Sequence, residues 1–143
     1  MKLSRETDYG LQGLIYLARR RQDRLVGLED IAKAQHLPRS FLAKTFQKFA
    51  RHGLVRSSRG VDGGFVLARH PATVTLREIV EAVEGPDLFD RCVFWSDRCG
   101  DQNPCPLHAR WALLKEQSAK LFEKTTLEEL AGEPRLRGRA RRA

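Results

Sequence analysis

The sequence predicts a mainly α-helical protein with a small β-hairpin wing, that is, a winged helix-turn-helix followed by a long C-terminal dimerisation helix. Three observations lead to this fold class. Apolar residues recur at helical spacing in the first third of the chain. A glycine-rich turn then separates two short stretches of β-forming residues. A long helical pattern follows after position 103.

Three helices are expected before the hairpin. Ser4 can cap the first, because its hydroxyl can accept from the backbone amides of the opening turn. A short second helix is expected from about Leu28, and a third opens at Pro38, where a residue without a backbone donor loses nothing. The third helix should end near Gly53, a natural left-handed cap. It turns four residues inward: Leu42, Thr45, Phe46 and Phe49.

The wing is expected from two β-rich stretches, residues 54–58 and 65–68, with Asp62-Gly63 between them. An Asp-Gly pair in this position is typical of a tight hairpin. Arg59 lies where the wing leaves the sheet, and a lone arginine there can enter a minor groove of DNA. The spacing of the wing glycines matches no nucleotide-binding fingerprint, and no βαβ unit surrounds them.

Two further helices are expected in the second half. A capping box at Thr75 and Glu78 opens a connecting helix that Gly85 ends. The longest helix is expected to start at Asn103-Pro104 and to run to about Lys124, before a short final helix. Its apolar residues form a seam typical of a helix pair, for which a second copy of the chain is the simplest partner: Leu107, Trp111, Leu114, Ser118 and Leu121.

Charge divides the chain unevenly. Residues 1–60 hold 13 Lys and Arg against 5 Asp and Glu, whereas residues 61–134 hold 8 against 13. A basic first half beside an acidic remainder indicates a phosphate-facing surface on one part only. We expect a winged helix-turn-helix domain at residues 1–70 and a connecting helix at 71–89. A cysteine-rich cluster-binding loop at 90–105 should precede a dimerisation helix with a short final helix at 106–132. A basic disordered tail is expected at 133–143.

The outer face of the third helix is the expected nucleic-acid contact. It offers cations and hydrogen-bond donors, and no residue of this helix is acidic. Exposed helices normally mix both signs, so this face is suited to phosphates and base edges, although a merely basic helix would read in the same way. The residues of this face are Arg39, Ser40, Ala43, Lys44, Gln47, Lys48 and Arg51.

All three cysteines, Cys92, Cys99 and Cys105, lie within 14 residues, and His108 follows them. No membrane span or secretory signal is apparent, so we expect a cytoplasmic protein in which thiols stay reduced. Thiolates suit zinc, copper(I) or iron–sulfur clusters, and Cys105 and His108 are expected on one face of the long helix's first turn. Paired Cys-x-x-Cys knuckles are lacking, so the spacing favours a cluster, with zinc or metal-free thiols as alternatives.

An enzyme is not expected. No cysteine and histidine come with an orienting acid and an oxyanion loop, which a thiol nucleophile would need. The three cysteines also look alike in their surroundings.

The chain resembles, over nearly its full length, the Rrf2-type winged-helix transcriptional regulators (the IscR/NsrR family). The matching segments are spread along the sequence and together form a specific signature. They are Thr7-Asp8-Tyr9-Gly10-Leu11, Ile31-Ala32, Gly53-Leu54-Val55, Arg59-Gly60 with Gly63-Gly64-Phe65, Ile79 to Gly85-Pro86, and the three cysteines.

This resemblance implies a homodimer that binds a pseudo-palindromic DNA operator under control of an iron–sulfur cluster. We expect the protein to act as a repressor. The signal would be nitric oxide, redox state or iron–sulfur status. The three cysteines carry over as ligands. The fourth ligand stays open, because His108 matches the members with a 2Fe–2S cluster and Asp8 matches those with a 4Fe–4S cluster, and an exogenous ligand is the third choice. A zinc-stabilised DNA-binding protein without cluster sensing is the alternative function.

The resemblance also bears on DNA contacts. Ser40 and Lys44 occupy positions that face bases in the family, and Arg59 with Gly60 matches its wing. Ala43 stands where the assembly regulator has a base-reading acid, so that regulator's operator sequence cannot be carried over. The expected DNA-binding residues are Arg39, Ser40, Lys44, Gln47, Lys48, Arg59 and Gly60.

Overall fold

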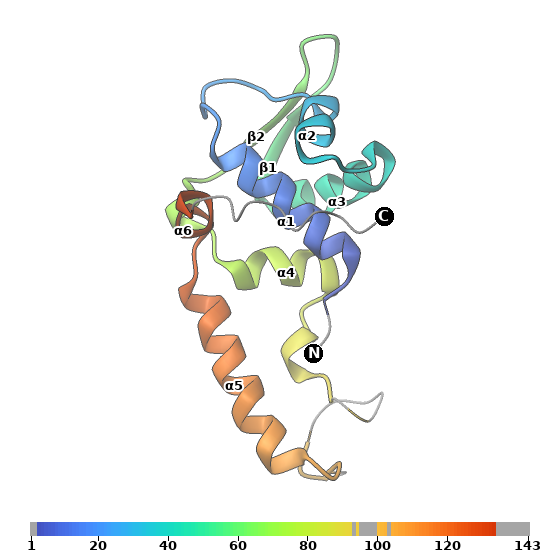
Figure 1. The fold of residues 1–143 in the computed structure, drawn as a ribbon, viewed down its shortest axis with the longest axis vertical. Coiled ribbons are helices and arrows are strands. Elements are labelled where there is room, and N and C mark those ends of the chain that lie inside the picture. The colour runs from blue at the N-terminus through green and yellow to red at the C-terminus, as the bar shows by residue number, and fades with distance from the viewer. Residues whose placement is uncertain (1–2, 93, 95–99, 103, 134–143) are drawn as a thin grey trace.

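The computed structural model describes residues 3–92, 94, 100–102 and 104–133 of the 143-residue chain. These residues form a helical head with a small hairpin, from which a long helix extends (Figure 1). The predicted fold class is therefore confirmed. Cys99 and the predicted basic tail beyond residue 133 lie outside the described residues. The elements are α1 (Arg5–Ala18), α2 (Leu28–Gln35), α3 (Arg39–Arg51), β1 (Val55–Ser58), β2 (Gly64–Leu67), η1 (Pro71–Thr73), α4 (Leu76–Glu84), η2 (Leu88–Asp90), α5 (His108–Lys124) and α6 (Leu127–Gly132).

Local capping decides where several helices begin. The Ser4 side chain accepts from the Thr7 amide at the start of α1, as predicted. Thr75 opens α4 with a complete capping box, in which its hydroxyl and the Glu78 carboxylate satisfy each other's backbone amides. Thr126 opens α6 in the same way.

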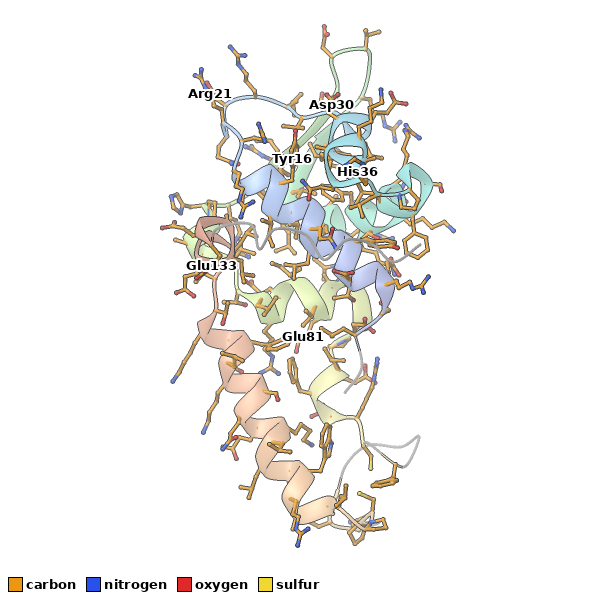
Figure 2. All side chains as sticks on the ribbon, viewed as in Figure 1. Tyr16, Arg21, Asp30, His36, Glu81 and Glu133 are labelled. Carbon is orange, nitrogen blue, oxygen red and sulfur yellow. The ribbon has the colours of Figure 1, made fainter. Side chains whose placement is uncertain are left out.

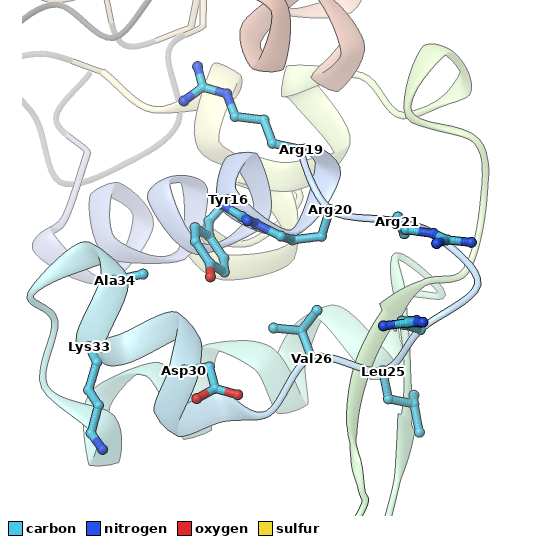
Figure 3. A pocket seen from close by; sticks show the side chains of 10 residues that line it. Tyr16, Arg19, Arg20, Arg21, Leu25, Val26, Asp30, Lys33 and Ala34 are labelled. Atoms are coloured by element: carbon cyan, nitrogen blue, oxygen red, sulfur yellow. The ribbon is translucent and has the colours of Figure 1, made fainter.

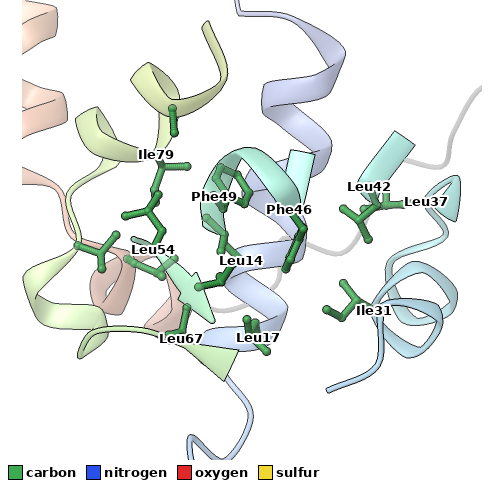
Figure 4. Packing of buried hydrophobic residues seen from close by; sticks show 14 of the residues in the cluster. Leu14, Leu17, Ile31, Leu37, Leu42, Phe46, Phe49, Leu54, Leu67 and Ile79 are labelled. Carbon is green, nitrogen blue, oxygen red and sulfur yellow. The ribbon is translucent and has the colours of Figure 1, made fainter. Parts of the chain in front are cut away.

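The core of the head lies between α1, α2, α3 and the hairpin (Figure 4). Leu14, Ile31, Leu42 and Phe46 are fully buried within it. Helices α1 and α3 approach closely because α1 carries glycine at the crossing: a Cβ at Gly10 would lie 2.5 Å from the Thr45 side chain and 2.8 Å from that of Phe49. Because this side of α3 packs closely against α1, the opposite side of α3 faces solvent.

The wing is larger than the predicted hairpin. Strands β1 and β2 pair antiparallel, with Val55 opposite Leu67. The segment before α2 adds an antiparallel bridge to β2, because Val26 and Phe65 exchange both backbone hydrogen bonds at 2.8 Å. This approach requires glycine next door: a Cβ on Gly64 would lie only 2.4 Å from the Val26 carbonyl oxygen.

The long helix α5 leaves the head and packs on α4 and η2. A small second cluster joins them, in which Val80, Leu88 and Phe89 contact Phe122. The Phe89 and Phe122 rings meet edge to face at 5.3 Å, a favourable aromatic arrangement. Helix α6 then returns to the head, where the Leu127 amide donates to the Val74 carbonyl at 2.8 Å. No described helix is long and apolar enough to cross a membrane.

The predicted start of α5 at Asn103-Pro104 is wrong, since the helix begins at His108 with Leu107 as its cap. Pro106 explains the difference: a residue before proline is pushed out of the helical region, so Cys105 cannot be helical. A turn precedes the helix instead, with the His108 amide donating to the Cys105 carbonyl at 3.0 Å. Cys105 and His108 therefore do not share a helix face as expected.

Candidate DNA-binding surface and cysteine segment

The outer face of α3 is exposed, as the sequence indicates. Arg39, Ser40, Lys44 and Gln47 are exposed along it, while the opposite side of the helix is buried in the core. Ser40, Lys44 and Gln47 lie at helical spacings of four and three, so they line one side. Three of the predicted DNA contacts thus share one side of α3, and Arg39 is exposed beside them at the start of the helix.

Neighbouring helices bring acids to this face, which the sequence of α3 alone did not reveal. Glu6 of α1 forms an ion pair with Lys48 at 2.8 Å and accepts from the buried Thr45 hydroxyl at 3.3 Å. Glu29 of α2 lies 3.6 Å from Arg39 in a much more exposed pair. Lys48 is therefore engaged within the chain, unlike the exposed Lys44. No local pattern predicts these pairs, because each joins two helices.

The wing presents Arg59 and Gly60 at its outer end. Both residues are exposed, and Gly60 has a φ of 107°, in the region that favours glycine. The Gly63 amide donates to the Gly60 carbonyl at 3.0 Å and closes the turn. The wing tip, Val61, is fully exposed. Arg59 is thus the first residue of the exposed loop that joins β1 to β2.

The cysteines that the structure describes differ in exposure. Cys105 is buried, whereas Cys92 is half-buried and its sulfur accepts from the Phe94 amide at 3.4 Å. Among the described residues, no group of three His, Cys, Asp or Glu side chains is arranged to hold a metal ion. This finding does not include Cys99. The donor set itself, with three thiols and an imidazole, has the chemistry that suits an iron–sulfur cluster or zinc.

The two candidate fourth ligands have different surroundings. His108 contacts Asp101 through Nε2 at 2.9 Å, and its side chain is only 20% exposed. A carboxylate on one ring nitrogen is common in metal-binding histidines, because it fixes the tautomer. Asp8 is exposed on α1 and accepts from the Gln12 amide group at 2.8 Å. The contact with Asp101 had no signal in the sequence.

A hydrogen-bonded link joins the cysteine segment to α1. Arg91, next to Cys92, donates to the Glu84 carbonyl at 2.6 Å. The Glu84 carboxylate accepts from the Ser4 amide at 2.7 Å and from the Thr7 hydroxyl at 2.5 Å. Burial raises the pKa of Glu84, but the hydrogen bonds from Thr7 and Ser4 outweigh it and hold the pKa below its ordinary value. Glu84 thus ties the end of α4 to the start of α1.

The predicted seam of α5 faces outward in the single chain. Side chains along the outer side of α5 project away from the rest of the molecule (Figure 2). Leu107, Leu114 and Leu121, each seven residues from the next, are 38%, 55% and 61% exposed. Trp111 is partly covered and donates through its indole N–H to the Arg91 carbonyl at 3.3 Å. The structure therefore leaves an apolar stripe at heptad spacing on α5.

An arginine-rich hollow lies between the end of α1 and α2 (Figure 3). Two of its arginines, Arg19 and Arg20, make contacts within the chain. Arg19 donates to the carbonyls of Ala131 and Glu133 at 2.7 Å, and Arg20 stacks over the Tyr16 ring at 4.3 Å. The Arg19 contacts close α6 against the end of α1, whereas Arg20 packs on α1 itself.

A basic recognition helix, a glycine-shaped wing and a helical head define the class of winged helix-turn-helix DNA-binding regulators. The profile of one such family, Rrf2, described as an iron-dependent transcriptional regulator, matches residues 3–133. The chain belongs to the Rrf2 family of transcriptional regulators. It is accordingly a regulator of transcription and not an enzyme.

Individual relatives agree with this assignment. A protein of Aquifex aeolicus (strain VF5), provisionally named an HTH-type transcriptional regulator, is 39% identical over 85% of both chains. The HTH-type transcriptional regulator IscR of Xenorhabdus nematophila is 30% identical over 91% of this chain and 79% of its own. Among solved structures, CymR, the global cysteine regulator of B. subtilis, superposes with a TM-score of 0.77 at 29% identity, covering 92% of this chain and 96% of its own. T. potens IscR superposes with a TM-score of 0.70 at 28% identity over 91% and 85%.

Proposed function

We propose that this protein is a dimeric, sequence-specific repressor, acting in the cytoplasm, whose operator affinity is controlled by an iron–sulfur cluster. Cys92, Cys99 and Cys105 would hold the cluster, with His108 or Asp8 as the fourth ligand. When bound, the cluster would supply a centre that oxygen, nitric oxide or iron shortage can alter. Every other step of the proposal concerns residues of the chain.

The observation that carries the proposal is the contact chain from Cys92 to α3. Arg91, next to Cys92, holds the end of α4 through the Glu84 carbonyl. The Glu84 carboxylate holds the first turn of α1, and Glu6 in that turn holds Lys48 of α3. A change in the cysteine segment that displaces Arg91 would therefore reach the recognition helix through these ion-pair and hydrogen-bond contacts.

His108 is the better supported fourth ligand within one chain. It starts α5, beside the Cys105 turn, and its contact with Asp101 would fix the ring for ligation. Asp8 lies on α1, so it would serve only if the dimer brings a partner's α1 to this cysteine segment.

Dimerisation is supported by the apolar stripe of Leu107, Leu114 and Leu121. Exposed leucines at heptad spacing on one helix are typical of a helix that packs on a second helix. Burying one leucine side chain stabilises an interface by about 1.5–3 kcal/mol. In a dimer of two such chains, a two-fold axis would relate the two recognition helices, which suits a pseudo-palindromic operator.

Iron, sulfide and zinc per chain, measured on anaerobically purified protein with its visible spectrum, test the cluster. Iron and sulfide near 2:2 would support a 2Fe–2S cluster with His108, and values near 4:4 would favour a 4Fe–4S cluster with Asp8. Bands that bleach in air or nitric oxide would support sensing. Stoichiometric zinc without colour would overturn the cluster proposal in favour of a zinc-stabilised DNA-binding protein.

A further inference from the structure

One large apolar side chain stands on the otherwise hydrophilic outer surface of α3. Phe41 is 42% exposed, whereas Phe46 and Phe49 of the same helix are completely buried. Phe41 follows Ser40 directly and lies three residues before Lys44, so it borders the surface that these two residues form. Packing of the core therefore does not account for the large aromatic side chain at position 41.

The ring of Phe41 is held in place from α1. Tyr9 meets it edge to face, with ring centroids 5.8 Å apart and an interplanar angle of 76°. This geometry is favourable for aromatic pairs and restrains the ring without covering it. The backbone on which Phe41 sits is also fixed, because the Thr45 hydroxyl donates to the Phe41 carbonyl at 3.1 Å. A rigid apolar group thus projects beside the hydrogen-bonding groups of α3.

Double-stranded DNA offers one apolar feature to a helix in its major groove. Thymine carries a C5-methyl group there, and aromatic or aliphatic side chains recognise it by contact. The other bases present hydrogen-bond donors and acceptors at their major-groove edges, which Phe41 cannot match. A fixed aromatic ring on a base-reading helix therefore selects thymine over cytosine at the position it meets.

We infer that Phe41 is a specificity-determining residue that recognises a thymine methyl group in the operator, with Tyr9 as the residue that positions its ring. This inference rests on the proposed base-reading role of α3. Ser40, Lys44 and Gln47 would read polar base edges beside it. Phe41 adds a contact that the charged and polar residues of the face cannot make.

The charge around Phe41 favours DNA over an apolar protein partner. Lys44 is exposed three residues from Phe41 on α3, and Lys48 lies on the same side of the helix as Phe41. A protein interface centred on Phe41 would have to bury these cations, whereas DNA phosphates would neutralise them.

The test begins with selection of preferred duplexes from a randomised library by the wild-type dimer. The enriched duplex is then rebuilt with deoxyuridine at each thymine in turn, which keeps base pairing and removes only the methyl group. We expect one thymine in each half-site at which wild-type affinity falls about fourfold, the ratio that corresponds to one buried methyl-sized group. The variant Phe41→Ala should bind the thymine and uracil duplexes equally.

Matched variants separate recognition from structure. Phe41→Leu keeps an apolar side chain and should keep part of the discrimination. In a duplex with cytosine at that thymine position, replacing the cytosine with 5-methylcytosine should restore the affinity of wild type but not that of Phe41→Ala. Phe41→Ala should retain wild-type affinity for random DNA, which shows that α3 is still folded. Unaltered thymine discrimination by Phe41→Ala, or equal losses on enriched and random DNA, would overturn the inference. If wild type enriches no sequence at all, the proposed base-reading function fails instead.

Discussion

The ion pair between Glu6 and Lys48 leads to the most specific prediction. In the free protein, the Lys48 ammonium lies 2.8 Å from the Glu6 carboxylate, and the two side chains are 33% and 24% exposed. If Lys48 contacts a DNA phosphate in the complex, it must first leave Glu6. The substitution Glu6→Gln removes that competition, and its amide oxygen can still accept from Thr45.

The expected gain follows from the pair's exposure. A partly exposed pair contributes about 0.2–1 kcal/mol, so its loss should raise DNA affinity by about 1.4- to 5-fold on every sequence. The salt dependence of binding should also become steeper by up to about one phosphate contact. Fluorescence anisotropy on enriched and random duplexes at several salt concentrations would measure both quantities.

A control with the same charge change is available on α5. Glu116 pairs with Lys120 at 3.0 Å on that helix, away from α3, so Glu116→Gln should leave DNA affinity unchanged. In a Lys48→Ala background, Glu6→Gln should lose most of its effect. If Glu6→Gln leaves affinity and salt dependence unchanged, Lys48 stays paired to Glu6 on DNA and is not a phosphate contact.

Three other substitutions test separate parts of the molecule. Arg59→Ala should weaken binding to the enriched site by about 1–3 kcal/mol and to random DNA much less; equal losses would refute base or groove recognition by the wing. Leu114→Lys should raise the dimer dissociation constant by roughly 100-fold or more, since two copies each lose about 1.5–3 kcal/mol, while Leu113→Lys, off the heptad stripe, should not; sedimentation equilibrium measures both. Because the pKa of Glu84 is lowered on folding, its carboxylate stabilises the protein at neutral pH, and this contribution is lost as the pH falls through the folded pKa. Glu84→Gln should therefore flatten the loss of stability in acid, and an unchanged acid-unfolding profile would contradict the role of this carboxylate.

Local sequence rules predicted much of the fold because they depend on a few adjacent residues. Ser4 and Thr75 cap their helices through amides within three positions, so spacing alone identifies them. The wing follows from turn residues between β-forming stretches. The predicted start of α5 was wrong because Pro106 disfavours a helical conformation at Cys105, so the helix begins after it.

Most parts of the candidate site that could not be predicted join distant segments of the chain. The Glu6–Lys48 pair spans α1 and α3, and the Glu84 contacts join α4 to α1. The β-bridge between Val26 and Phe65 likewise depends on how the segment before α2 packs against the wing. Such contacts leave no periodic signal, because either partner would be an ordinary surface or loop residue by itself. The candidate ligands Cys92, Cys99, Cys105, His108 and Asp8 remain predictions from sequence and resemblance.

Operator affinity of one preparation in two states is the most direct test of cluster control. Protein reconstituted anaerobically with iron and sulfide, and the same protein after chelation, would be titrated onto the enriched duplex and onto random DNA. Coupling between two sites typically amounts to about 1–3 kcal/mol, so we expect the two states to differ by about 5- to 150-fold on the enriched duplex. Cys92→Ser should abolish that difference while random-DNA affinity stays constant. Equal affinity of both states for the enriched duplex would contradict control of DNA binding by the cysteine segment.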